Sequence, residues 1–131
     1  MISIFFAVKQ PVRILLLILY VCAVAILSLL PPNDLPHMPL FKGADKVIHF
    51  LMYFIFSLLF CWALKTEMHY SRLVIIVFVA IGWGIFLEFV QFEMHLGRSF
   101  SWYDIFANSM GVFFGILIYI VVAGKYRISR A

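Results

Sequence analysis

The side chains in this sequence that could do chemistry fall in three short stretches of an otherwise apolar chain. Carboxylates and histidine can transfer protons, lysine and arginine can bind anionic groups, and amides and hydroxyls can orient a ligand. The candidate set is Asp45, Lys46, His49, Tyr53, Glu88, Gln91, Arg98, Ser99, Asp104 and Asn108.

Helical spacing places these candidates on shared faces. Residues three or four apart lie on one side of a helix. Three stripes follow this rule: Asp45, His49 and Tyr53; Gly84, Glu88, Gln91 and His95; and Asp104, Asn108, Gly111 and Gly115. Ionisable groups that face lipid are costly, so each stripe is expected to face the interior of a helix bundle. The small residues Ala107, Gly111 and Gly115 would allow two helices to approach closely beneath the polar groups.

The composition of the chain indicates what kind of protein must position these stripes. Of the 131 residues, 66% are hydrophobic and 12% are charged, whereas soluble domains are about 45–50% apolar and about 25% charged. The mean hydropathy is +1.09. A chain this small has too little interior to hide so much apolar surface from water. It is therefore expected to be an integral membrane protein.

Four apolar runs, at about 12–30, 45–64, 73–92 and 104–123, are long enough to cross a hydrocarbon core of about 30 Å as helices. The sequence thus predicts an all-α, four-helix membrane bundle that forms one domain over residues 1–131. Pro11 precedes the first run and Pro31 and Pro32 follow it. Asp45 and Asp104 stand at helix starts, where carboxylates can cap free N–H groups.

The distribution of lysine and arginine predicts the orientation. Seven of these residues flank the runs on the side of both termini and three on the other side, so the termini are expected to be cytoplasmic. The net charge of +4 is spread over helix ends and forms no basic face, which argues against nucleic-acid binding. The first run resembles a signal peptide at Ala23-Val24-Ala25, but its length favours a retained helix.

This orientation brings the candidates to one depth near the outer face. His49, Glu88 and Asn108 each lie four residues from the outer end of their helix, about 6 Å down its axis. Cys22 and Cys61 fall inside apolar runs at different depths and are expected to be packing residues. Trp83, Trp102 and Tyr103 are expected as interfacial anchors or lipid-facing bulk.

The residues resemble the VanZ-like family of membrane proteins over about 29–115. The resemblance is carried by Asp45-Lys46-Val47-Ile48-His49-Phe50, Tyr53, Glu88-Phe89-Val90-Gln91, Gly97-Arg98-Ser99, Asp104, Asn108, Gly111 and Gly115. Leu96 departs from the family, which often has proline there, and this puts the shape of that loop in doubt. The family takes its name from a protein linked to low-level resistance to the glycopeptide teicoplanin. The resemblance implies a multi-pass protein of the bacterial cytoplasmic membrane that acts on the cell envelope.

Several interpretations of the polar stretches stay open, including whether any reaction is catalysed. In one, Arg98 and Lys46 bind the anionic head of a lipid-linked envelope precursor or a glycopeptide, while His49 and Glu88 exchange protons. In a second, the same groups only lock the helices together among membrane lipids. A metal site at His49, Glu88 and Asp104 lacks a dense ligand motif, and a transport pathway lacks charge at mid-bilayer. No cofactor or metal is therefore predicted.

Overall fold

The computed structural model describes residues 7–30, 43–64, 70–95 and 100–128. They form four helices: α2 Gln10–Leu29, α3 Ala44–Ala63, α4 Tyr70–Glu93 and α5 Trp102–Ile128. Each helix is long and apolar enough to cross a membrane, and no strand occurs within the described ranges. The prediction of an all-α, four-helix membrane bundle is confirmed. Two helices are longer than predicted, because α4 begins at Tyr70 rather than at 73 and α5 continues to Ile128 rather than to 123.

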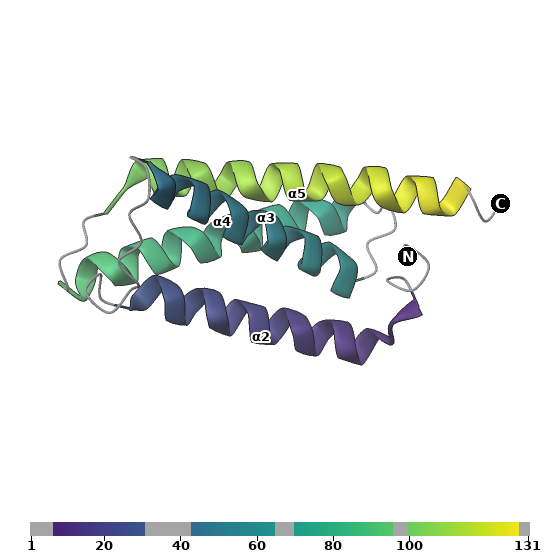
Figure 1. Cartoon of the computed structure of the whole chain (residues 1–131), viewed down its shortest axis with the longest axis horizontal. Coiled ribbons are helices and arrows are strands. Elements are labelled where there is room, and N and C mark those ends of the chain that lie inside the picture. The colour runs from purple at the N-terminus through teal and green to yellow at the C-terminus, as the bar shows by residue number, and fades with distance from the viewer. Residues whose placement is uncertain (1–6, 31–42, 65–69, 96–99, 129–131) are drawn as a thin grey trace.

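The four helices run alternately up and down the long axis of the molecule (Figure 1). In this view α2 and α5 lie along opposite edges, and α3 and α4 cross between them. One end of the bundle, which we call the polar end, contains the last residues of α2 and α4 and the first residues of α3 and α5. The opposite end contains the start of α2 and the end of α5. The up-and-down order therefore places the sequence-predicted candidates of three helices at the polar end.

Glycines bring α3 and α5 into the closest contact of the bundle. A Cβ atom added to Gly111 would lie 2.9 Å from Phe54 N and closer still to Phe50 O, and one added to Gly115 would collide with Phe54 O and Ser57 Oγ. Only a hydrogen at these two positions lets the backbones approach so closely. The predicted close approach at the small-residue stripe is confirmed, and its partner is α3.

The core lies around α3, and the outward faces are apolar as well. Buried side chains include Phe56 and Trp62 of α3, Ile76 of α4 and Val112 of α5. Large hydrophobic side chains such as Phe78, which is 74% exposed, cover the outside of the helices. Such a continuous apolar surface is stable in lipid and would be a liability in water.

The starts of α3 and α5 are capped differently from the prediction for Asp45 and Asp104. Gly43, with a φ of 92°, precedes α3 and provides no side-chain cap. At α5 the cap is Ser101, whose Oγ accepts a hydrogen bond from Asp104 N at 3.3 Å. Both aspartate side chains lie in the first turn of their helix and pair with Lys46. Neither aspartate is the N-cap residue itself, but the Asp45 carboxylate does accept backbone N–H groups at the start of α3.

Arg13 holds two helices together, in addition to the part that its charge has in predicting the orientation of the protein in the membrane. Its side chain is buried, with Nε donating to Val8 O at 2.8 Å and Nη1 donating to Trp62 O at 3.1 Å. The guanidinium carbon lies 5.2 Å from the centre of the Trp62 ring, which adds a cation–π contact. Arg13 thus binds the Trp62 carbonyl in the last turn of α3, where a cation also meets the negative end of the helix dipole.

Replacing Arg13 by methionine should lower the melting temperature of the detergent-solubilised protein. The variant loses hydrogen bonds from a charged donor, which contribute about 1.5–3 kcal/mol each when buried. Arg72→Met removes one charge from an exposed position at the same end of the bundle and serves as the control. Equal melting temperatures for the two variants would show that Arg13 contributes charge only.

Candidate functional site

An ion pair joins α3 to α5 at the polar end. Lys46 Nζ lies 2.6 Å from Asp104 Oδ1 and also pairs with the Asp45 carboxylate on its own helix. The Lys46 side chain is 38% exposed and that of Asp104 is 14% exposed. Two segments 58 residues apart in the sequence are therefore linked by charge at a partly exposed position.

His49 lies one helical turn below this ion pair, between a carboxylate and an amide. Its Nδ1 is 3.2 Å from Asn108 Oδ1, and its Nε2 is 3.9 Å from Asp104 Oδ2. A hydrogen bond to an amide oxygen requires a proton on Nδ1, which leaves Nε2 facing the carboxylate of Asp104. Protonation of Nε2 would create a second positive charge beside Asp104.

Glu88 and Gln91 of α4 are buried and bind the neighbouring segments. Glu88 Oε1 accepts a hydrogen bond at 2.8 Å from Ser101 N, just before α5. Gln91 Nε2 donates to Ser28 O near the end of α2. Both side chains therefore connect α4 to another part of the bundle, as the interior-facing stripe predicts.

Tyr53 lies beneath the ionisable groups. Its ring packs edge-on against Phe56 with centroids 5.9 Å apart. A Cβ on Gly84 would lie 3.1 Å from Tyr53 Oη and 3.2 Å from Asn108 Nδ2. Gly84 thus leaves room for polar side chains from α3 and α5 to meet beside α4.

The structure connects the predicted candidates in two groups, which we name for the rest of the description. The headgroup cluster comprises Asp45, Lys46, His49, Asp104 and Asn108. Its ionisable side chains are exposed or partly exposed, and the buried Asn108 amide contacts His49 below them. The inner layer comprises the buried side chains Tyr53, Glu88 and Gln91. Arg98 and Ser99, together with Leu96 and the shape of its loop, lie outside the described residues. His95, the last member of the α4 stripe, is exposed, with a φ of 53°.

Two serines contribute contacts that the sequence analysis missed. Ser101 caps α5 and donates its backbone N–H to Glu88. Its spacing of three residues from Asp104 matches a capping-box pattern, so the sequence contained a usable signal. Ser28 is bound through its backbone oxygen, for which residue type provides no signal.

The carboxylate of Asp104 lies near His49 Nε2, whereas Glu88 Oε1 accepts a hydrogen bond from Ser101 N. The pairing of His49 with Glu88 in proton exchange stays a prediction. Lys46 is flanked by two carboxylates. A ligand that binds here therefore has to exchange partners with existing ion pairs, so a head with both acceptor and donor groups fits better than a simple anion.

Comparison with known proteins finds similarity over nearly the whole chain. The sequence profile of the VanZ/LLP1 family matches residues 2–123. An uncharacterized protein of the fission yeast Schizosaccharomyces pombe is 28% identical over 116 residues, which cover 88% of this chain and 67% of the yeast protein. No solved structure matches. Because a yeast protein shares this similarity, the similarity does not by itself place the chain in a bacterial membrane. With nearly its whole length matched by the profile, the chain belongs to the VanZ/LLP1 family of membrane-type proteins.

Proposed function

We propose that this chain binds an amphiphilic cell-envelope ligand, with the ligand's polar head at the headgroup cluster and its apolar part in the surrounding lipid. The polar end would face the outer side of a bacterial cytoplasmic membrane, with both termini in the cytoplasm. A lipid-linked envelope precursor or an acylated glycopeptide such as teicoplanin has the required chemistry. Tolerance of teicoplanin would follow from such binding.

The observation that carries the proposal is the partial exposure of the Lys46–Asp104 pair beside His49. Lys46 supplies N–H donors, Asp104 supplies acceptors, and His49 can act as either. Their exposed fractions, between 14% and 38%, make them reachable from the headgroup region. If a reaction takes place, His49 and Asp104 form the proton-exchanging pair, and Glu88 supports the start of α5 from behind. Arg98 and Ser99, close by in the sequence, would add an anion-binding group and a hydroxyl.

A second candidate function is structural, in which the polar end only locks the bundle. It is favoured by the inner layer, because Glu88 and Gln91 are buried and bind backbone groups of neighbouring segments. The two functions differ in one respect. A lock needs the contacts alone, whereas a ligand site also needs the ionisable chemistry of His49.

His49→Gln separates these functions because glutamine can still bind Asn108 but cannot take up a proton. If the cluster binds a ligand, bacterial cells that express the variant should lose the teicoplanin tolerance conferred by the wild type, while the melting temperature of the purified protein changes little. Susceptibility, membrane abundance and melting temperature are measured together. His95→Gln, at an exposed histidine of the same end, is the matched control.

Loss of tolerance that always accompanies loss of stability would favour the structural lock. Unchanged tolerance in a stable His49→Gln variant would exclude proton exchange at His49. A wild type that confers no tolerance would remove glycopeptides as the ligand and leave lipid-linked precursors to be tested by the binding measurement described in the Discussion.

A further inference from the structure

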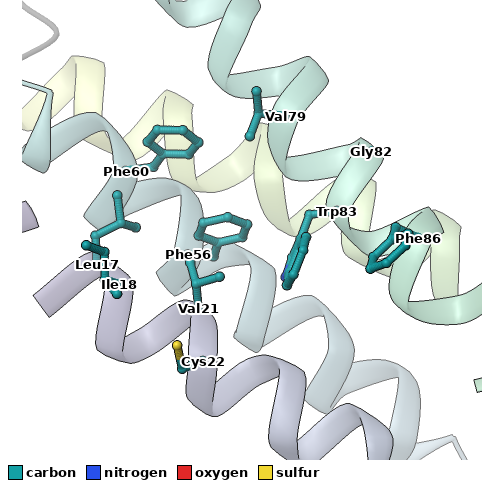
Figure 2. Close-up of a pocket in the computed structure, with 10 residues that line it drawn as sticks. All are labelled: Leu17, Ile18, Val21, Cys22, Phe56, Phe60, Val79, Gly82, Trp83 and Phe86. Atoms are coloured by element: carbon teal, nitrogen blue, oxygen red, sulfur yellow. The ribbon is translucent and has the colours of Figure 1, made fainter. Parts of the chain in front are cut away.

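A hollow in the described part of the chain lies away from the polar groups, between α2 and α4. Figure 2 shows side chains of these two helices facing each other across a gap, with Phe56 and Phe60 of α3 between them. The volume is about 400 Å³. We call this feature the lateral groove.

The groove is closed by aromatic side chains on the protein side. Phe56 and Phe60 stack with centroids 5.7 Å apart and form its floor, and Trp83 stacks on Phe86 at 5.6 Å along the α4 wall. The Cys22 sulfur and the Trp83 indole nitrogen are the only polar atoms of the lining side chains. A bound water needs two to four polar partners, so this lining does not suit water.

The opposite side of the groove is open. Ile18 and Phe86 are 53% exposed, and both belong to the apolar outer faces of α2 and α4. Nearer the polar end, the hydrogen bond from Gln91 to Ser28 O ties α4 to α2. Towards the opposite end the two helices diverge in Figure 1. The groove is therefore continuous with the surface that contacts lipid.

We propose that the lateral groove is a binding site for one acyl chain of a bilayer phospholipid. Interiors of proteins and membranes are close-packed, so a hollow that opens to lipid is filled by whatever hydrocarbon fits it. A volume of about 400 Å³ lies within the usual range for small-molecule sites.

Size argues for a chain rather than for a helix of a partner protein. A helix is about 10 Å across, so it could enter a hollow of about 400 Å³ with only a few of its side chains. An acyl chain is thin and flexible enough to lie along the groove between α2 and α4. This site goes beyond the proposed function and does not depend on it.

Gly82 provides the test, because a Cβ at this position meets nothing within 4 Å and the residue lines the groove. Gly82→Phe should fill the groove without disturbing the protein. Gly124→Phe adds the same side chain to α5, where a Cβ also meets nothing within 4 Å, and is the matched control. The probe is phosphatidylcholine with a photoactivatable diazirine in the middle of one acyl chain, reconstituted with the full chain in vesicles.

Cross-links mapped by mass spectrometry should be several-fold more frequent at the groove than on the outward face of α5 around Phe113 and Leu117. Gly82→Phe should remove this excess and Gly124→Phe should preserve it. Equal labelling of the two faces in the wild type, or an excess that survives in Gly82→Phe, would overturn the proposal. Gly82→Leu repeats the test with a smaller side chain if Gly82→Phe reduces the melting temperature. Both positions lie outside the headgroup cluster, so failure here leaves the proposed function intact.

Discussion

Gly111→Leu should abolish the folded bundle, and this is the largest effect that we expect from any single substitution. The new Cβ would lie 2.9 Å from Phe54 N and closer to Phe50 O, and both are backbone atoms within α3. Overpacking of a core by flexible side chains costs about 1–3 kcal/mol. Here α3 as a whole would have to move, so we expect a loss above about 3 kcal/mol. The variant should be nearly absent from membranes and polydisperse on size exclusion in detergent.

Gly124→Leu is the control for this experiment. It introduces the same side chain on the same helix, but its Cβ meets nothing within 4 Å. We expect the abundance and melting temperature of wild type. A Gly111→Leu protein that is as abundant and stable as Gly124→Leu would contradict the close α3–α5 contact on which the geometry of the headgroup cluster depends.

Glu88→Leu should lower the stability of the protein strongly, and Glu88→Gln much less. Glu88 is 3% exposed and accepts the hydrogen bond from Ser101 N at 2.8 Å. Leucine removes this acceptor, and hydrogen bonds to buried charged groups contribute about 1.5–3 kcal/mol. Glutamine retains a carbonyl oxygen at the same place. The melting temperatures of both variants in detergent measure the difference.

The pair of Glu88 variants also tests the chemical role of this carboxyl group. A stable Glu88→Gln protein that keeps its function would show that Glu88 supports the fold and does not exchange protons. A stable Glu88→Gln protein that loses function would support the predicted proton exchange between His49 and Glu88. Equal stability of Glu88→Leu and wild type would contradict the structural role assigned to the Ser101 contact.

Much of the fold could be predicted from the sequence because lipid leaves few alternatives. Apolar runs of membrane-spanning length must form helices, and ionisable groups on them must face one another. These two constraints were enough to place His49 and Asn108 at one level and to predict the contact at Gly111. Helix ends were less predictable, as the extra residues at the end of α5 show.

Details that depend on competition between partners could not be predicted. The Asp104 carboxylate could bind either backbone N–H groups at the start of α5 or the Lys46 ammonium. Only the three-dimensional position of Lys46 decides which partner it binds. Arg13 carries the same charge whether it lies in the headgroup region or binds Trp62 O. Trp83, expected as an anchor or lipid-facing bulk, is half-buried in the wall of the lateral groove, whereas Trp102 is exposed as expected.

The most direct test of amphiphile binding at the headgroup cluster is to identify the lipids that copurify with the protein. Three proteins would be purified from the same bacterial membrane: wild type, a His49→Gln/Asp104→Asn double variant and His95→Gln. Their melting temperatures would be compared first to show that all three are folded, and their bound lipids would then be analysed by mass spectrometry. We predict that one class of amphiphile is enriched over the bulk membrane in wild type and His95→Gln and falls about tenfold in the double variant, which corresponds to about 1.4 kcal/mol. The same lipid composition in all three proteins would contradict ligand binding and leave the headgroup cluster as a structural lock.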